Sequence, residues 1–157
     1  MNSKVSVIVP VFNSEKSIGE CLQSIISQSH PVYELIVIDD DSRDSTISLV
    51  HRFIEVNPSL RISLLRNDQN SGPGYSRNKG IQAAQGEFIA FLDSDDTWLP
   101  HHLETYLQAY KAFHLSKQSV VVSSAPISDT SLFNGPAPTT LEIRALSLLR
   151  MVFFQRG

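Results

Sequence analysis

Residues 35–41 read Leu35-Ile36-Val37-Ile38-Asp39-Asp40-Asp41, a short apolar run that ends in three aspartates. Apolar runs of this length, rich in β-branched residues, are typical of strands buried on both faces of a sheet. The pattern returns in a second stretch, Phe88-Ile89-Ala90-Phe91-Leu92-Asp93-Ser94-Asp95-Asp96. Each stretch therefore predicts a buried strand with a cluster of acidic residues at its carboxyl end.

Further strands and helices alternate around these two strands. Apolar runs predict strands at 5–9, 62–65 and 120–122, and apolar residues at helical spacing predict helices at 18–26, 47–54, 75–84, 100–110 and 141–152. Asn13 or Ser14 is the predicted N-cap of the first helix. The alternation indicates an α/β fold in which a mostly parallel central sheet is flanked by helices.

Length and charge narrow the class of protein. The chain has 157 residues, enough for one domain with its own core. Its 13 basic and 16 acidic residues give a net charge of −3, which argues against a nucleic-acid partner. Cys21 is the single cysteine, so no intramolecular disulfide forms. We see no signal peptide and no apolar stretch of the ~18 residues that a membrane-spanning helix needs, and we expect a cytoplasmic chain.

The aspartates are the leading candidates for a site. The carboxyl ends of parallel strands meet at one edge of a sheet, where ligands of open α/β folds bind, so the six aspartates at 39–41, 93, 95 and 96 are expected together there. Such carboxylates repel one another unless cationic or hydrogen-bonding groups join them, and oxygen ligands at this density suit Mg²⁺ or Mn²⁺. A lone aspartate is more often a turn or cap residue, as we expect for Asp44, Asp68 and Asp129.

A glycine-containing loop, Asn70-Ser71-Gly72-Pro73-Gly74, carries weaker information. It matches neither the G-x-G-x-x-G fingerprint of dinucleotide-binding proteins nor the G-x-x-x-x-G-K-[ST] P-loop, so both classes lose their main support. Arg77, Asn78 and Lys79 follow at the start of a helix. These side chains either face a nucleotide or solvate a surface turn, and the residues alone leave both interpretations open.

Four motifs follow one another along the chain, namely Val5-Ser6-Val7-Ile8-Val9-Pro10-Val11-Phe12-Asn13, residues 35–45, residues 70–80, and residues 86–96. In their order and spacing they resemble glycosyltransferase family 2, over residues 5–100 of this chain. The resemblance implies a GT-A fold, which is a Rossmann-like sandwich, and an inverting enzyme with a nucleotide-diphospho-sugar donor. It also implies a nucleotide-sugar-binding subdomain at 1–125, followed at 126–157 by a loop and the truncated start of an acceptor-side region.

The resemblance further implies a donor site. Pro10 and Phe12 would line the base pocket, Asp40 would accept a hydrogen bond from the base, and Asp93 would lie near the ribose and diphosphate. Asp93-Ser94-Asp95 matches the family's DXD motif, in which Asp95 would hold a divalent cation, Mn²⁺ or Mg²⁺, to offset charge on the leaving nucleoside diphosphate. The donor-binding residues implied in this way are Pro10, Phe12, Asn13, Asp40, Arg77, Asn78, Asp93 and Ser94.

The reaction implied by the resemblance is sugar transfer, with a UDP-linked donor favoured, to a glycan or lipid-linked acceptor in polysaccharide biosynthesis. Inverting transfer needs a general base, and no residue after Pro100 is a convincing one, so we expect the base to be absent from this chain. The alternative function is a non-catalytic module for nucleotide-sugar binding or for assembly.

Asp41 and Arg43 depart from the family, which usually has a glycine and a small hydroxyl residue at these positions. Aspartate tolerates the left-handed backbone that such a glycine permits.

The segment 141–154 carries apolar residues toward the end of the chain, namely Leu148, Val152, Phe153 and Phe154. If an acceptor-side region normally covers this segment, its exposure favours a homodimer or peripheral contact with the inner face of a membrane. We therefore predict one of these two contacts for this segment.

Overall fold

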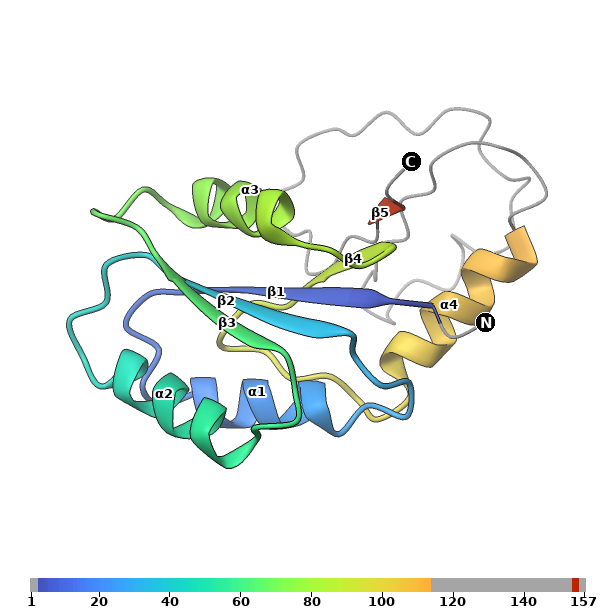
Figure 1. Ribbon diagram of the computed structural model, residues 1–157, viewed down its shortest axis with the longest axis horizontal. Coiled ribbons are helices and arrows are strands. Elements are labelled where there is room, and N and C mark those ends of the chain that lie inside the picture. Colours follow the sequence, from blue (N-terminus) through green and yellow to red (C-terminus); the bar gives the residue numbers. More distant parts are fainter. Residues whose placement is uncertain (1–2, 114–153, 156–157) are drawn as a thin grey trace, which may run out of the picture.

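A computed structural model describes residues 3–113 and 154–155, which form an α/β sandwich (Figure 1). The strands are β1 (Val5–Val11), β2 (Glu34–Asp39), β3 (Ile62–Arg66), β4 (Phe88–Phe91) and β5 (Phe154–Gln155), and the helices are α1 (Ile18–Ile26), α2 (Thr46–Val56), α3 (Pro73–Ala83) and α4 (His102–Phe113). The predicted strand at 120–122, the helix at 141–152, the boundary at 125 and the apolar residues 148, 152 and 153 lie outside the described residues.

The sheet has the strand order β3-β2-β1-β4-β5. The pairs β1–β2, β1–β4 and β2–β3 are parallel, so that Ile8 lies opposite both Ile36 and Phe91. β5 adds a two-residue antiparallel edge with Ile89 opposite Phe154. The mostly parallel sheet predicted from the sequence is confirmed, and Phe154, one of the apolar residues noted at the end of the chain, belongs to this edge strand.

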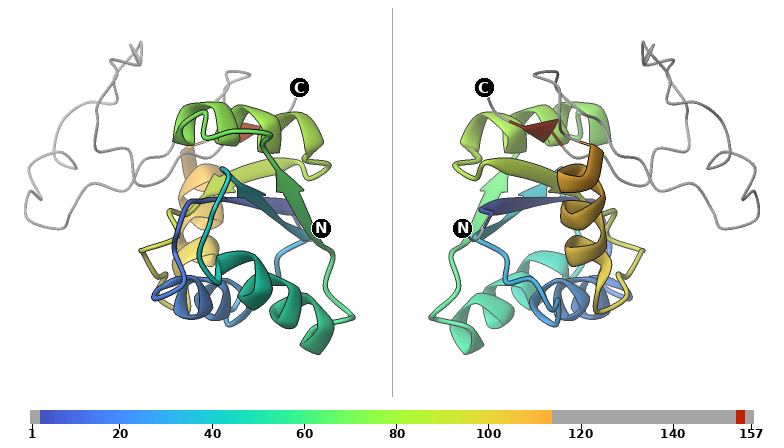
Figure 2. Two further views of the ribbon diagram at one scale, coloured as in Figure 1. Left: turned by 90° about the vertical axis from the view of Figure 1, so that its left-hand side faces the viewer. Right: turned by 90° about the vertical axis from the view of Figure 1, so that its right-hand side faces the viewer.

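Different helices cover the two faces of the sheet. In Figure 1, α3 lies above the sheet and α1 and α2 lie below it, and the side views of Figure 2 show the same three layers. Within the described part of the chain, none of the helices combines the length and the apolar character needed to cross a membrane. The buried residues of α1 recur at helical spacing, as the sequence predicts, and are Ile18, Cys21, Leu22 and Ile25.

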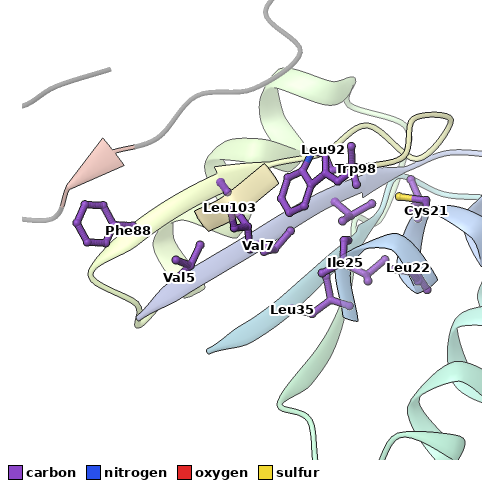
Figure 3. Packing of buried hydrophobic residues seen from close by; sticks show 14 of the residues in the cluster. Val5, Val7, Cys21, Leu22, Ile25, Leu35, Phe88, Leu92, Trp98 and Leu103 are labelled. Carbon is purple, nitrogen blue, oxygen red and sulfur yellow. The ribbon is translucent and has the colours of Figure 1, made fainter. Parts of the chain in front are cut away.

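The main core lies between the sheet and the helices α1, α2 and α4. The odd-numbered residues of β1 all belong to it, because alternate residues of a strand share one face. Figure 3 shows Leu22 and Ile25 of α1 packed beneath this strand, close to Val7. Ile8 belongs to a second cluster on the opposite face, below α3. Burial on both faces explains why the strands read as continuous apolar runs.

A buried polar network joins the amino ends of three strands. Ser6 of β1 donates a hydrogen bond to Glu34 of β2 at 2.5 Å, and the backbone N–H of Gly86, just before β4, donates to Ser6 Oγ at 2.8 Å. Glycine is needed at position 86 because a Cβ there would lie 2.5 Å from Ser6 Oγ and 2.7 Å from the Ser6 backbone nitrogen. The network fixes the strands at the edge of the sheet opposite the site.

Helix α1 begins later than its predicted cap. Its N-cap is Ser17 rather than Asn13 or Ser14. Asn13 has a φ of 48°, and its side-chain carbonyl accepts a hydrogen bond from the N–H of Arg43 at 2.8 Å. The carbonyl of Ser14 accepts from the N–H of Ile18 at 2.9 Å and so closes a turn. The prediction of the cap is wrong because both residues are engaged in loop contacts.

The strand order creates a crevice at the carboxyl edge of the sheet. From β1 the chain moves outward through β2 to β3, and it then returns to the other side of β1 as β4. In open α/β sheets, ligands bind at such a reversal, beyond the carboxyl ends of the strands. The loops that follow β1, β2 and β4 therefore meet at one place.

Candidate functional site

A cleft of about 590 Å³ lies at this edge of the sheet. The described residues that line it are Pro10, Val11, Phe12, Asn13, Ser14, Ser17, Asp40, Asn70, Gly72, Pro73, Ser76, Asp93, Ser94 and Asp95. The cleft thus brings together all of the site residues suggested by the sequence except Arg77 and Asn78. Its walls come from the loops after β1, β2 and β4 and from the start of α3.

The β1 end of the cleft is apolar. Phe12 follows directly on a fully buried strand, yet 48% of its side chain is exposed. Pro10, the neighbouring apolar residue of the lining, is held within β1 opposite Ile38 of β2. An exposed aromatic ring at the border of a polar cleft offers a surface on which a planar ring can stack.

Reciprocal hydrogen bonds join the loop after β1 to the loop after β2. The N–H of Asn13 donates to Ser42 Oγ at 2.9 Å, while the Asn13 side-chain carbonyl accepts from the N–H of Arg43 at 2.8 Å. At the next residue, the N–H of Ser14 donates to Thr46 Oγ1 at 2.7 Å. The two loops therefore form one continuous wall, and the side-chain carbonyl of Asn13 is committed to holding it.

Asp40 holds the loop that precedes α3. Its carboxylate accepts hydrogen bonds from Asn67 Nδ2 at 2.7 Å and from the N–H groups of Ser71 and Gly72 at 2.9 and 2.7 Å. Burial by itself raises the pKa of Asp40, but hydrogen bonds from these groups and from Ser76 outweigh it, so the pKa is lowered. Asp40 is therefore an ionised acceptor, and these four donors match the roughly four hydrogen bonds that a carboxylate can accept.

Most of the six aspartates of the sheet edge have partners within the protein. Asp39 is buried and pairs with Arg66 at 3.1 Å, and Asp41 lies 3.6 Å from Arg43. Among the described residues, no group of three or more His, Cys, Asp or Glu side chains is arranged to hold a metal ion. The repulsion expected among these carboxylates is thus relieved at Asp39, Asp40, Asp41 and Asp93 by partners within the protein, and a divalent cation at this edge stays a prediction.

Residues 93–96, here called the acidic loop, are anchored at Asp93 and Ser94. Arg77 of α3 contacts Asp93 Oδ1 at 2.5 Å, and the hydroxyls of Ser14 and Ser94 are 2.6 Å apart. Asp95 is exposed, and within the described residues its carboxylate has no hydrogen-bond or ion-pair partner. Asp95 is thus the carboxylate of the cleft that is available to a cation.

Cys21 lies beneath the acidic loop, and its thiol donates to the carbonyl of Asp93 at 3.5 Å. Burial, followed by the negative charges of Asp96, Asp93 and Asp95, raises the pKa of this thiol to about 12. The cysteine is therefore a packing residue and a weak donor rather than a nucleophile.

The polar residues of α3 reach different parts of the site. Arg77 pairs with Asp93, whereas Lys79 donates to Asn67 Oδ1 at 3.1 Å. Asn78 is exposed on the helix. The positively charged side chains of Arg77 and Lys79 therefore support different parts of the cleft wall. Contact of Arg77 or Asn78 with the donor stays a prediction.

Some residues that shape the cleft have no signal in the sequence. Asn67 is 5% exposed and donates to both Asp40 and Ser76, at 2.7 and 2.9 Å. Asn67, Ser76 and Ser14 are single polar residues whose partners are set by the tertiary fold. Asp44, in contrast, is confirmed as a turn residue, since its side chain accepts from the N–H of Thr46 at 2.9 Å, just before α2 begins.

Comparison with known proteins relates this cleft to sugar transfer. The family described as Glycosyl transferase family 2 matches residues 6–151. The chain is 42% identical over 100 residues to UDP-Glc:alpha-D-GlcNAc-diphosphoundecaprenol beta-1,3-glucosyltransferase WfgD of Escherichia coli, which covers 64% of this chain and 38% of WfgD.

Two solved structures share the fold. TarS 1-349 of S. aureus, in complex with UDP, superposes with a TM-score of 0.66 at 37% identity, over 75% of this chain and 34% of that one. The mannosyltransferase PcManGT from Pyrobaculum calidifontis, in complex with GDP-Man and Mn²⁺, has a TM-score of 0.69 at 30% identity, over 80% of this chain and 36% of that one.

The match to the family is extensive along this chain but partial along its relatives. The chain spans less than half the length of the curated relatives it matches. The GT-A type of α/β sandwich expected from the sequence is confirmed by the structural neighbours. The family match over residues 6–151, together with the shared fold, shows that the chain belongs to glycosyl transferase family 2.

Proposed function

We propose that the cleft binds a nucleotide-diphospho-sugar, with a UDP-linked sugar favoured, for transfer to a glycan or lipid-linked acceptor in polysaccharide biosynthesis. The observation that carries the proposal is the composition of one cleft, whose lining includes the exposed ring of Phe12 and the carboxylate of Asp95, which has no partner within the described residues. A nucleotide sugar has the matching groups, namely a planar base that stacks on an aromatic ring and a diphosphate that binds cations.

The base and ribose would occupy the side of the cleft formed by β1 and β2. The ring of Phe12 and the neighbouring Pro10 offer the base an apolar surface. Asp40 lines the same cleft as an ionised carboxylate, and it would accept a hydrogen bond from a ring N–H of the base, which uracil and guanine possess, by sharing an oxygen with one of its present donors. Asp93 and Ser94 line the same cleft and would face the ribose and diphosphate.

A divalent cation, Mn²⁺ or Mg²⁺, fits the residues present. Ions of this type are held in many enzymes by one or two carboxylates together with substrate phosphates, so the absence of a three-residue cluster in the described part of the chain is compatible with one. Asp95 is the residue that would hold it. When bound, the cation would neutralise charge on the departing diphosphate.

The similar proteins support the donor class and favour UDP. WfgD carries UDP-Glc in its name, TarS was solved with UDP, and PcManGT was solved with GDP-Man and Mn²⁺. Two of these three proteins are thus linked to uridine nucleotides. The WfgD name also describes a lipid-linked glycan acceptor, which is the acceptor class proposed here.

Isothermal titration calorimetry of the 157-residue chain with UDP, CDP and GDP, each with and without Mn²⁺, tests the proposal. We expect UDP to bind most tightly and Mn²⁺ to strengthen its binding. Asp95→Ala should remove the increase in UDP affinity that Mn²⁺ causes, so that UDP binds roughly tenfold or more weakly than to the wild type in the presence of Mn²⁺. The circular dichroism spectrum should stay unchanged. Glu55→Ala, which removes an exposed carboxylate of α2, is the matched control.

Failure of all three nucleotides to bind under any metal condition would contradict the donor site. An unchanged Mn²⁺ dependence in Asp95→Ala would remove Asp95 from its proposed role. A measurement of UDP released from a bound UDP-sugar then distinguishes the two functions. A transferase releases UDP and needs a general base to do so, whereas the alternative, a module that only binds the donor, does not.

A further inference from the structure

The acidic loop is held by side chains from three separate parts of the fold. Arg77 of α3 pairs with the Asp93 carboxylate, the thiol of Cys21 in α1 donates to the Asp93 carbonyl, and the Ser14 hydroxyl meets that of Ser94. None of these contacts involves the Asp95 side chain. The loop is therefore fixed at its first two residues, while the carboxylate proposed to bind the cation stays free.

Arg77 supplies the strongest of these contacts. Its guanidinium lies 2.5 Å from Asp93 Oδ1, and 28% of its side chain and 34% of that of Asp93 are exposed. An ion pair that is this short and largely shielded from water is worth more than a surface pair. Asp93 lines the cleft, whereas Arg77 is not among the described residues that line it. The guanidinium thus supports the wall behind Asp93.

Release of Arg77 from Asp93 would be costly in a donor complex. If the guanidinium turned to the diphosphate, it would leave the Asp93 carboxylate unpaired beside the negative phosphates and beside Asp95. Neighbouring negative charges repel one another, so this arrangement of the arginine would be disfavoured. With Arg77 in place, Asp93 is compensated, and the cation has only the charges of Asp95 and the diphosphate to balance.

We propose that Arg77 is a positioning residue, which acts on the donor through Asp93 and fixes the acidic loop, and that it makes no direct contact with the diphosphate. This inference rests on the proposed function, because its effect is read as metal-dependent UDP binding. It assigns Arg77 a different role from the donor contact that the motif suggests.

A double-mutant cycle tests the proposal in the full chain, using UDP and Mn²⁺ in calorimetry and following free Mn²⁺ by electron paramagnetic resonance. Arg77→Ala should weaken UDP binding in the presence of Mn²⁺ about tenfold, the scale expected when a charged hydrogen bond is lost. Arg77→Lys keeps a cation for Asp93 and should recover most of the loss. In an Asp93→Ala background, Arg77→Ala should change the affinity by less than twofold, since Arg77 has nothing left to position.

The matched control is Arg52→Ala, which removes a cation from the exposed face of α2 and should leave UDP and Mn²⁺ binding unchanged. A tenfold loss on adding Arg77→Ala to Asp93→Ala would overturn the proposal, because it would show a contact independent of Asp93. If Asp93→Ala binds too weakly to measure, a crystal structure with UDP and Mn²⁺ decides. The guanidinium is expected on Asp93, and its presence on a phosphate oxygen would refute the positioning role.

The inference and the proposed function fail in different ways. Wild-type chain that binds no nucleotide contradicts the donor site itself. Wild-type chain that binds UDP with Mn²⁺, but whose Arg77→Ala variant binds equally well with a native circular dichroism spectrum, retains the donor site and loses the role of Arg77.

Discussion

Asp41 and Asn13 occupy left-handed backbone positions on the two loops that form the first wall of the cleft. Their φ angles are 67° and 48°, and they are the described non-glycine residues with positive φ. Aspartate and asparagine are the residues that visit this region most readily after glycine. The sequence indicates this for Asp41, which stands where the family usually has glycine. The Asp41–Arg43 pair at 3.6 Å adds little, because 84% of the arginine side chain is exposed.

Asp40 leads to a prediction about stability and pH. Its pKa is lowered from the ordinary 3.8, so the ionised carboxylate stabilises the folded chain above that value, and this contribution is lost as the pH falls through the folded-state pKa. Asp40→Asn should therefore lower the free energy of unfolding at pH 7 by about 1.5–3 kcal/mol. The difference from wild type should shrink toward pH 3. Urea unfolding at pH 7, 5 and 3 measures it.

Asp68→Asn is the control for this prediction, because Asp68 is an exposed aspartate of the loop that follows β3. It should change the unfolding free energy by less than about 0.5 kcal/mol at each pH. A difference between Asp40→Asn and wild type that stays constant from pH 7 to pH 3 would mean that the charge of Asp40 does not hold the loop.

At the scale of the element, the apolar pattern predicts that a strand or helix is present more accurately than it predicts where that element begins and ends. The strands predicted at 5–9 and 35–38 appear as Val5–Val11 and Glu34–Asp39, because residues at the strand ends complete the hydrogen-bonded ladder whatever their polarity. The cap of α1 is the larger miss. Local sequence favours Asn13 or Ser14, but the partners of these residues lie on the loop after β2 and at the first residue of α2, about 30 residues away. Contacts of that range leave no trace in local spacing.

Helix α3 lies close to the sheet at Gly80, and this predicts an unusual effect of alanine. A Cβ at position 80 would lie 2.6 Å from Ile8 Cγ2 and 2.9 Å from Ile38 Cδ1. Alanine in place of glycine inside a helix ordinarily stabilises by roughly 0.5–1 kcal/mol. Here overpacking, which costs about 1–3 kcal/mol, exceeds that gain, so Gly80→Ala should destabilise by about 1–2 kcal/mol in urea unfolding.

Gly19 provides the matched comparison, because a Cβ at that position of α1 meets nothing within 4 Å. Gly19→Ala should show that ordinary gain and raise stability by about 0.5–1 kcal/mol. If Gly80→Ala proved as stable as Gly19→Ala, the close approach of α3 to the sheet would be incorrect.

For the whole molecule, the sequence predicts which strand ends meet but not how the cleft is closed. The parallel alternation places Asp40 and Asp93 at one edge, and the structure confirms that both line the cleft. The support behind them, Asn67 for Asp40 and Arg77 for Asp93, comes from the loop and helix between β3 and β4. Such contacts depend on how α3 crosses the sheet, which periodicity does not specify. The walls are thus a property of the assembled fold.

This assembly predicts how a bound donor changes the dynamics of the chain. The cleft draws on four segments that lie far apart in sequence, at about 10–17, 40, 70–76 and 93–95. A ligand that spans the cleft stabilises the closed state of all four at once, and at 100 times its Kd it adds about 2.7 kcal/mol to the cost of opening. UDP with Mn²⁺ should therefore slow amide hydrogen exchange in all four segments, while the exposed face of α2 around Glu55 exchanges as before.

Hydrogen exchange followed by mass spectrometry measures this protection. In Asp95→Ala, the share of the protection that depends on Mn²⁺ should be lost. Protection confined to a single segment would show that the walls respond independently and that the cleft is not one site.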